Sequence, residues 1–519
     1  MGHLLAIDAG TGNVRATAFT DEGEFVLTVS RPWAARPDPR YPGSLDFPAA
    51  EYWPLVAECT REVVERAVPD RQVDAVAVAS ARGGFVLVDR DGRELWGCAA
   101  TDARAARQAQ DLRSKDPECE MRAYARSGQT LAMNAAPRLL WLQAHEPSIY
   151  TRAAALLMFS DWIALRLCGR ASADPSNACT TGLVDLASRS WAPDVAGDFG
   201  LRTDLFPPMQ EPGSIVGDVS PAVADETGLP PGVAVVTAGG DAQVAALGMG
   251  AVDAGDTAVV GGSFWQQLVN LDRPATDPRM RVRVTCHAIP DRWQGDALVF
   301  RAGLVARWFL EAFRGDASHP TDEEFARLEQ RAAAIPPGSH GVISVFSNSM
   351  DYGNWRHAAP SFLGLPVDDP PADVRAVLFR SILENVAIVA RANLELIASA
   401  TATTPAGAVA FGGGAARSRL WSQILADVLD RPVRVPQVAE STSFGAALCA
   451  GYAVGAFDAP PITARVLVRW AREHEPRPEA TRVYGEVLER WRAAYAAQEA
   501  LVRAGVTRPM WSPGDEVNG

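Results

Sequence analysis

Two regions of the chain repeat one hydrophobic pattern: a short apolar stretch, a turn of small residues, and a second apolar stretch. In the first region, residues 4–8 (LLAID) and 14–20 (VRATAFT) flank the turn 9–13. In the second region, residues 256–262 (DTAVVGG) lead through a turn at Gly261–Ser263 into FWQQLVN. Short apolar runs separated by glycine-containing turns predict β-hairpins.

Helical periodicity alternates with buried-type strands after each hairpin. The first half has a predicted helix at 49–68 and a predicted strand at 73–80. The second half has a long predicted helix at 375–400, followed by a strand at 408–411. The helices show apolar residues at 3.6-residue spacing, and the strands are continuous apolar runs.

This repeated order predicts an α/β protein with two related domains and a cleft between them. The N-terminal domain is expected over 1–250 and the C-terminal domain over 251–519. After Gly455 the pattern predicts helices only, the last at 479–504, before a frayed tail at 512–519. Eight evenly spaced strand–helix units are not visible, which argues against a TIM barrel.

The composition excludes several functional classes. The chain has 519 residues and a formal net charge of −13. An acidic chain repels phosphate backbones and anionic lipids, so neither a nucleic-acid role nor a membrane-surface role is expected. The sequence has no run of about 18 apolar residues, and its N-terminus lacks the features of a signal peptide. A cytoplasmic protein is therefore expected.

Cysteine, lysine and histidine usage excludes further classes. The seven cysteines have no C-x-x-C spacing, which argues for a reducing compartment and against a disulfide framework. Lys115, the only lysine, fits neither a P-loop nor the strand lysine of protein kinases, and Schiff-base chemistry would need Lys115 itself. The seven histidines show no zinc-protease spacing, and G-x-S-x-G is absent, so a zinc site and an α/β-hydrolase are not expected.

The two glycine turns suggest binding of a polyphosphate. Glycine lets backbone N–H groups approach an anion, and Thr11 and Ser263 add hydroxyl groups. One turn from each half could hold a nucleotide across the cleft, and Gly412–Gly414 could accommodate its adenine or ribose. Asp8, at the end of the first strand, could hold Mg²⁺ through water. Each turn alone is equally well explained as a plain tight turn.

Asp241 is the best-placed candidate for a general base. It follows the predicted strand VAVVTAGG and begins a predicted helix, and such strand ends face the ligand crevice in open α/β sheets. A carboxylate there can take the proton of a phosphoryl acceptor. A simple helix cap is an equally weighted alternative for Asp241, and it is the favoured interpretation of Asp161 in SDW.

Six segments in order, from residue 4 to about residue 456, resemble the FGGY carbohydrate kinases: IDAGTGNVRA, the cluster Trp96 to Arg104 with Asp102, SDW, DPSNA, GGDAQVAALG and FGGGAARSRLWSQILADVL. These kinases belong to the actin/hexokinase-like ATPases. The resemblance therefore implies an α/β fold of two ribonuclease-H-like domains that flank a catalytic cleft. It also implies ATP and Mg²⁺ as cofactors and the phosphorylation of a small hydroxylated molecule.

Carried over position by position, the resemblance implies that Asp241 is the catalytic base and that Asp8 and Asp241 hold the metal. It implies substrate contacts by Arg82, Asp241 and Gln243. The nucleotide-binding positions that it implies are Gly10, Thr11, Arg15, Gly261, Gly262, Ser263, Gly303, Gly413, Gly414 and Ser418.

Three positions depart from the family pattern. Gly83 stands where many members have Glu, which removes a polyol contact and argues against glycerol as the substrate. Gly262 stands where Thr is frequent, and Asn13 where Ser or Thr is usual. Further stretches, among them GSLDF, SGQTLA and GGSFWQQLVN, are similar to members that phosphorylate the terminal hydroxyl of 4,5-dihydroxy-2,3-pentanedione, the open-chain form of autoinducer-2. That resemblance implies the same substrate here.

Alternatives remain open at this stage. The chain could be another FGGY kinase of the xylulose, ribulose or erythritol type, a catalytically silent nucleotide or sugar sensor, or an actin-like filament protein. A small-molecule substrate is the expected partner, with no nucleic acid and no membrane, and a homodimer is allowed. Trp265 and His287, near the second turn, could line the pocket or belong to the core.

Overall fold

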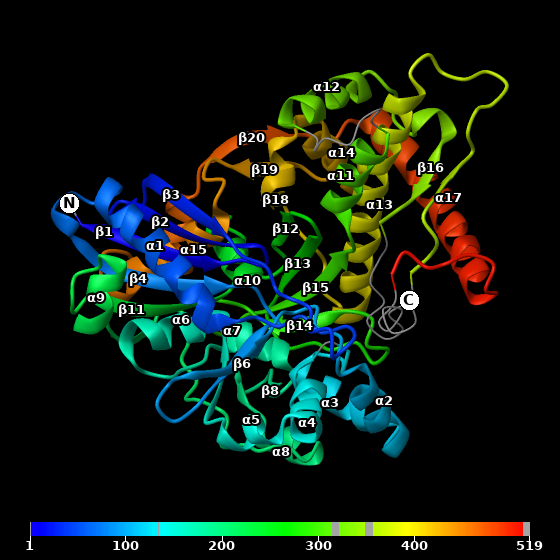
Figure 1. Ribbon diagram of the computed structural model, residues 1–519. Coiled ribbons are helices and arrows are strands. Elements are labelled where there is room, and N and C mark those ends of the chain that lie inside the picture. The colour runs from blue at the N-terminus through cyan, green and yellow to red at the C-terminus, as the bar shows by residue number, and fades with distance from the viewer. Residues whose placement is uncertain (1, 133, 314–320, 348–356, 512–519) are drawn as a thin grey trace.

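The computed structural model describes residues 2–132, 134–313, 321–347 and 357–511. Two large mixed β-sheets, one in each half of the chain, lie next to each other (Figure 1). The first sheet has the order β10, β11, β4, β1, β2, β3: Ile215–Asp218, Ala234–Gly240, Val73–Ser80, His3–Ala9, Asn13–Thr20 and Phe25–Pro32. The second has the order β14, β15, β13, β12, β18, β19, β20: Arg283–Cys286, Trp293–Val299, Trp265–Leu271, Thr257–Gly261, Val409–Gly412, Val433–Pro436 and Trp470–His474.

The two sheets repeat one connectivity, which confirms the predicted duplication. In the first sheet, β1, β2 and β3 are antiparallel neighbours, β4 and β11 run parallel to β1, and β10 is antiparallel. In the second sheet, β12, β13 and β15 are antiparallel neighbours, β18 and β19 run parallel to β12, and β20 is antiparallel. The strand β14 is added at the open edge, beside β15.

The remaining elements complete the two halves. The small sheets contain β5 Phe85–Val88, β6 Glu94–Cys98, β7 Ala155–Met158, β8 Val184–Asp185, β9 Ser190–Trp191, β16 Ile343–Val345 and β17 Ser361–Leu363. The helices of the first half are α1 Ala49–Ala67, α2 Ala106–Lys115, α3 Cys119–Ser127, α4 Ala135–His145, α5 Pro147–Arg152, α6 Phe159–Cys168, α7 Pro175–Ala178, α8 Pro193–Asp198, α9 Pro221–Thr227 and α10 Asp241–Gly248. Those of the second half are α11 Ala302–Ala312, α12 Asp322–Ala333, α13 Val374–Thr401, α14 Arg419–Leu429, α15 Ser441–Ala453, α16 Pro460–Leu467 and α17 Pro478–Arg503. Single 3₁₀ turns occur at Pro69–Arg71, Cys179–Thr181, Ser339–Gly341 and Gly414–Arg417.

The expectation of helices alone after Gly455 is wrong. Residues Trp470–His474 form β20, which pairs antiparallel with β19 at the edge of the second sheet. An edge strand needs no apolar pattern of its own, because one side of its ladder faces solvent and its neighbour supplies the pairing. Here Glu473 also pairs with Arg434 of β19, at 2.9 Å. The predicted frayed tail lies outside the described residues.

Helix α15 joins the two halves. It belongs to the second half in sequence but packs on the first sheet, where Phe444 lies 5.6 Å from Phe19 of β2, ring centre to ring centre. A Cβ atom on Gly248 of α10 or on Gly445 of α15 would overlap the backbone of the other helix. These glycines allow α10 and α15 to pack at close backbone distance. The proposed domain bounds, 1–250 and 251–519, remain a prediction.

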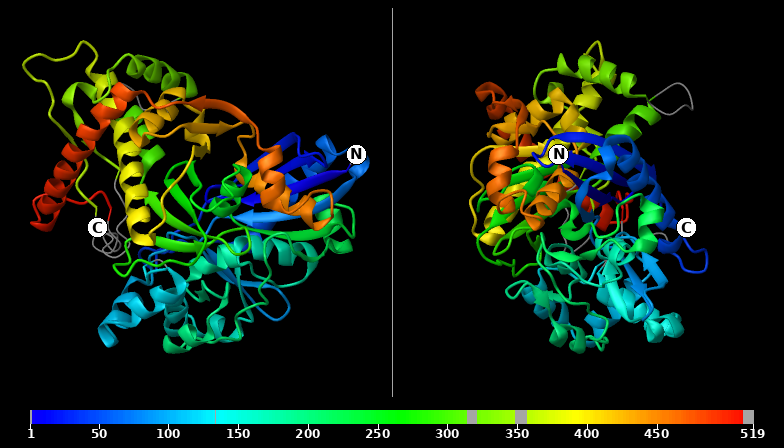
Figure 2. Two further views of the ribbon diagram at one scale, coloured as in Figure 1. Left: turned by 180° about the vertical axis from the view of Figure 1, so that it is seen from behind. Right: turned by 90° about the vertical axis from the view of Figure 1, so that its left-hand side faces the viewer.

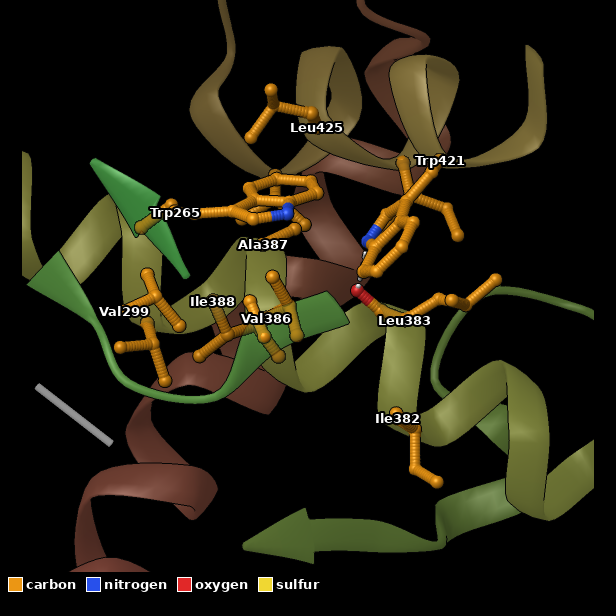
Figure 3. Close-up of a cluster of buried hydrophobic side chains, with 14 of the residues drawn as sticks. Trp265, Val299, Ile382, Leu383, Val386, Ala387, Ile388, Trp421 and Leu425 are labelled. Atoms are coloured by element: carbon orange, nitrogen blue, oxygen red, sulfur yellow. Dashed lines mark hydrogen bonds between the residues drawn. The ribbon is translucent and has the colours of Figure 1, made fainter. Parts of the chain in front are cut away.

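The core of the second half settles the role of Trp265. Its indole is fully buried between β13 and α14, 4.7 Å from the ring of Trp421 (Figure 3). Trp421 Nε1 donates to the carbonyl oxygen of Leu383 at 3.0 Å, which ties α14 to α13. Seen from behind, α13 and α17 run along the outer side of this half, away from the first sheet (Figure 2). Trp265 is therefore a core residue and not part of a pocket wall.

Candidate active site

A cavity of about 750 Å³ lies between the two halves of the chain. Its polar lining residues are Thr11, Arg82, Thr101, Thr180 and Asp241 from the first half, and Gln266, Arg283 and Arg301 from the second. Its large apolar lining residues include Phe264, Leu298, Phe300, Leu304 and Trp308. Asp241 is the one carboxylate among the described lining residues. Three of the predicted site residues, Thr11, Arg82 and Asp241, thus meet in one cavity.

Asp241 stands where it was predicted, directly after β11 and at the first position of α10. Its side chain is 31% exposed, and its Oδ1 accepts a hydrogen bond from the Ala242 backbone N–H at 2.7 Å. Desolvation by the surrounding protein raises the pKa of Asp241, and the nearby Arg82 opposes that rise. A carboxyl group with a raised pKa that still reaches the cavity is suited to accept a proton.

The backbone that carries Asp241 is held by a buried side-chain relay. The Gly240 N–H donates to Ser176 Oγ at 3.0 Å, and Ser176 Oγ donates to Asp174 Oδ1 at 2.5 Å. Gly239 has φ +117, and a Cβ there would overlap Ser176 Oγ and lie 2.8 Å from Asp174 Oδ1. Only glycine allows the strand end to approach α7 so closely. The string DPSN, which reads as a simple turn in the sequence, therefore fixes the position of the candidate base.

Arg82 connects the two halves across the cavity. Its Nε lies 3.5 Å from Asp241 Oδ1, and its Nη1 donates to Asp296 Oδ2 on β15 at 2.6 Å. The side chains of Arg82 and Asp296 are largely shielded from solvent, with exposures of 8% and 2%. Nothing local in the sequence marks Asp296, because its partner lies 214 residues away.

The wall beside Arg82 is organised by a second buried arginine. Arg138 of α4 donates to the carbonyl oxygens of Gly83 at 2.7 Å and of Ala100 at 2.6 Å. Asp102 accepts the Leu45 N–H at 2.7 Å and binds Arg104, whose guanidinium lies between the indoles of Trp96 and Trp141. The predicted cluster at residues 96–104 therefore supports the cavity wall from the protein interior. Arg138 itself has no recognisable signal within the apolar run of its helix.

Asp8 is suited to hold a cation. Its side chain is buried, its Oδ2 accepts from Arg15 Nη1 at 3.3 Å, and its Oδ1 has no partner among the described residues. Burial raises the pKa of Asp8 to about 7; Arg15 opposes this rise, and Asp241 and Glu440 contribute to it. A buried, unpartnered carboxylate oxygen close to a second carboxylate fits the chemistry of Mg²⁺. No group of three or more His, Cys, Asp or Glu within the described ranges forms a complete metal cluster by itself.

In the second half, the predicted nucleotide-binding turns contact one another through the backbone of their glycines, with no side chains between them. A Cβ on Gly413 would lie 2.5 Å from the Gly261 carbonyl oxygen, and a Cβ on Gly303 would overlap the Gly262 carbonyl. The Gly303 N–H donates to the Ser263 carbonyl oxygen at 3.1 Å. Nothing lies within 4 Å of a Cβ on Gly414. The cluster adjoins the cavity through Phe264 and Leu304, the residues that follow Ser263 and Gly303 in the sequence.

Other candidate residues lie away from the cavity lining. Gln243 is fully buried, and its Nε2 donates to Thr285 Oγ1 at 3.0 Å, so it contacts the second half instead. Ser418 caps α14 through the Trp421 N–H and donates to Glu329 at 2.6 Å. His287 is fully buried, and desolvation lowers its pKa to about 3, which is typical of a core histidine.

Asp161 has the structural role that was favoured for it, since its Oδ2 accepts the Met158 N–H at the start of α6, at 3.1 Å. Gly10 lies in the first turn with Thr11, and Arg15 follows that turn on β2, 3.7 Å from Glu440. The assignments of Gln243, Ser418, Gly10 and Arg15 to ligand binding remain predictions. In the described part of the chain, no helix has the length and apolar character needed to cross a membrane.

Comparisons with known proteins show the family of the chain. The pattern of the N-terminal domain of the FGGY family of carbohydrate kinases matches residues 3–248, and that of its C-terminal domain matches residues 268–454. The chain is 44% identical to an autoinducer-2 kinase of Photorhabdus laumondii, over 99% of this chain and 98% of that protein. It is 43% identical to an autoinducer-2 kinase of Salmonella typhimurium, with the same coverage.

Two solved structures share the fold at lower identity. A xylulose kinase from Rhodospirillum rubrum has a TM-score of 0.82 at 23% identity, covering 96% of this chain and 100% of that chain. A glycerol kinase from Plasmodium falciparum with ADP has a TM-score of 0.80 at 19% identity, covering 94% and 98%.

Proposed function

The chain belongs to the FGGY family of carbohydrate kinases, and from this premise we propose that it transfers the terminal phosphoryl group of ATP to the terminal hydroxyl of 4,5-dihydroxy-2,3-pentanedione, the open-chain form of autoinducer-2. One observation carries the proposal: Asp241, the only carboxylate among the described residues of the cavity wall, stands at a strand end where the two halves meet. The family's kinases use ATP, and the relatives named above are autoinducer-2 kinases.

In the proposed mechanism, Asp241 takes the proton of the acceptor hydroxyl. Its Oδ1 is engaged by the Ala242 N–H and lies next to Arg82, which leaves Oδ2 for the acceptor. Arg82, fixed by Asp296, holds the carboxylate and keeps its pKa from rising further. The relay through Ser176 and Asp174 keeps the backbone of this strand end in place.

The nucleotide is held by the turn at Gly10–Thr11 on one side and by the glycine cluster of Gly261, Gly303 and Gly413 on the other. Backbone N–H groups at the first turn stabilise the charge that develops on the phosphoryl group, which is usually the largest contribution to catalysis of phosphoryl transfer, and the glycine cluster lets the nucleotide approach the backbone closely. When bound, a Mg²⁺ ion held by Asp8 and Asp241 supplies further charge neutralisation at the phosphate oxygens. Closure of the two halves excludes water from the acceptor.

The lining of the cavity supports a carbonyl-rich acceptor over a polyol. Hydrogen-bond donors such as Arg82, Arg283 and Arg301 outnumber carboxylates, and Gly83 adds no side chain where a glutamate would bind a polyol hydroxyl. Ketone oxygens only accept hydrogen bonds, whereas polyol hydroxyls also need acceptors. The donors and the missing glutamate therefore favour the dione.

A panel of acceptors tests the substrate. The purified chain with ATP and Mg²⁺ is assayed for ADP release with the dione, xylulose, ribulose and erythritol. The dione should have a kcat/KM at least about tenfold above the others, a difference of about 1.4 kcal/mol in transition-state binding. A better turnover of xylulose or erythritol would assign the chain to another acceptor. ATP binding without turnover of any acceptor would favour the sensor.

The role of Asp241 is tested by Asp241→Asn. This variant should bind ATP with an affinity near that of the wild type and lose at least about 10² in kcat, because a general base is removed. Asp253→Asn is the matched control, since Asp253 is an exposed surface residue paired with Arg465. Turnover at the wild-type rate by Asp241→Asn would defeat the assignment.

A further inference from the structure

The C-terminal segment of the chain returns to the cavity between the two halves. Helix α17 ends at Arg503, and Gly505, with φ +70, turns the chain back from the end of the helix. The segment then runs toward the middle of the molecule (Figure 1), where Met510 and Trp511 line the same cavity as Asp241. No sequence pattern gave this segment a role.

Backbone and aromatic contacts fix the segment there. The Met510 N–H donates to the Ala358 carbonyl oxygen at 3.2 Å. The Trp511 ring lies 5.4 Å from Phe300 and 6.0 Å from His357, and Phe300 lies 4.5 Å from His357. Both Met510 and Trp511 are half-buried. The residues are therefore packed into one cluster and are not a loose chain end.

This aromatic cluster brings together three distant parts of the sequence. Around Phe300 it gathers Phe264 and Leu298 of the second half, Met510 and Trp511 of the C-terminal segment, and Ala132 of the first half. Phe264, Leu298 and Phe300 line the cavity as well. The cluster therefore forms an apolar wall that reaches both halves, in a cavity whose other lining residues supply the charged and hydroxyl groups.

We propose that Trp511 is a specificity-determining residue of the acceptor site, whose indole covers the carbon skeleton of the acceptor while the polar residues around Asp241 bind its oxygens. The proposal rests on the acceptor occupying this cavity, as in the proposed function. An aromatic side chain provides a large apolar contact with little loss of conformational entropy.

Three variants test the proposal by steady-state kinetics. Trp511→Ala should raise the KM for the acceptor about tenfold and leave the KM for ATP and kcat within about twofold, because it removes contact made equally in ground and transition state. Trp511→Phe should recover most of the lost affinity. Trp470→Ala is the matched control, since Trp470 lies on the edge strand β20 and is 39% exposed.

The acceptor used is 4,5-dihydroxy-2,3-pentanedione or, if the panel above selects another compound, that compound. A wrong substrate and a wrong role for Trp511 are thereby distinguished. An unchanged acceptor KM in Trp511→Ala overturns the proposal. So does a rise confined to the KM for ATP, which would place the segment at the nucleotide.

Hydrogen–deuterium exchange of the wild-type chain gives a readout that needs no variant. Addition of the acceptor with a non-hydrolysable ATP analogue should slow backbone exchange in residues 505–511, while the analogue alone should slow it less. Equal exchange with and without the acceptor overturns the proposal, even if Trp511→Ala does not fold.

Discussion

Gly239 provides a sharp test of how the candidate base is positioned. In Gly239→Ala the new methyl group would overlap Ser176 Oγ and come within 2.8 Å of Asp174 Oδ1. The backbone at Gly239, with φ +117, is also a conformation that L side chains rarely adopt. The substitution therefore adds backbone strain and pushes the Ser176 hydroxyl away from the Gly240 N–H.

The expected magnitude follows from these two effects. Strain in a sparsely populated backbone region costs about 1–3 kcal/mol. Leaving the buried Gly240 N–H without its acceptor costs a further ~1–3 kcal/mol. Gly239→Ala should therefore lower the free energy of unfolding by about 2–6 kcal/mol. Gly232→Ala is the matched control, since Gly232 has φ +86 and nothing within 4 Å of the new methyl group, so it should show the strain alone.

Urea unfolding of four proteins separates the two effects: the wild type, Gly239→Ala, Ser176→Ala and the double variant. Because Ser176→Ala removes the overlapped oxygen, the double variant should lose about 1–2 kcal/mol less than the sum of the single losses. Gly239→Ala should also lower kcat about 10²-fold, because a shift of the strained backbone at residue 239 moves Asp241 out of position. A loss of stability no larger than that of Gly232→Ala would refute the steric argument. Wild-type kcat in a clearly destabilised Gly239→Ala would refute the positioning role.

Two further substitutions test the buried carboxyl group of Asp8 and the nucleotide site. Because burial raises the pKa of Asp8 from 3.8 to about 7, its ionisation destabilises the fold as pH rises between these values. In EDTA, the stability of Asp8→Asn relative to the wild type should therefore rise by about 3 kcal/mol between pH 5 and pH 8, and a pH-independent difference in urea unfolding would contradict this. Gly303→Ala would push against the Gly262 carbonyl and should raise the KM for ATP at least about tenfold with little effect on the KM of the acceptor. Gly485→Ala, on α17 with nothing within 4 Å, is its control, and an unchanged KM for ATP in Gly303→Ala would remove the cluster from the nucleotide site.

Features set by neighbouring residues could be predicted from the sequence. The hairpin of β1 and β2, the position of Asp241 between β11 and α10, and the long helix α13 all follow from local periodicity and turn residues. Each depends on residues within one or two elements, so the pattern carries the information. Gly261 and Gly413 stand in glycine turns that the sequence itself marks, whereas Gly303 required the family resemblance, because nothing local distinguishes it in its segment.

Features set by long-range packing could not be predicted. Asp296 became a partner of Arg82 only because two sheets meet, and Arg138 binds carbonyl groups on loops that precede it by tens of residues. Strand β20 is polar because it lies at a sheet edge, and α15 crosses to the first sheet. Small residues at Gly248 and Gly445 were the one available sign of the close packing of α10 and α15.

The duplicated topology also places different chemical groups at corresponding strand ends of the two halves. At the end of β1 and of β11 the first half places the carboxylates of Asp8 and Asp241, and after β4 it places Arg82. At the corresponding end of β12 the second half has Val260 and Gly261, and after β18 it has Gly413. Bare backbone can contact a nucleotide closely but cannot move a proton, and a buried carboxylate can move a proton but repels phosphate. A single site cannot combine bare backbone for the nucleotide with a carboxylate for proton transfer without conflict. Because the sheet is duplicated, the carboxylates belong to one half and the bare backbone to the other, across a shared cavity. In the proposed mechanism the base and the glycine cluster belong to different halves, so phosphoryl transfer needs both halves in contact. Among the described residues, the ion pair between Arg82 and Asp296 and the hydrogen bond from Thr442 Oγ1 to the Asp241 carbonyl oxygen, at 3.4 Å, join the base to the other half.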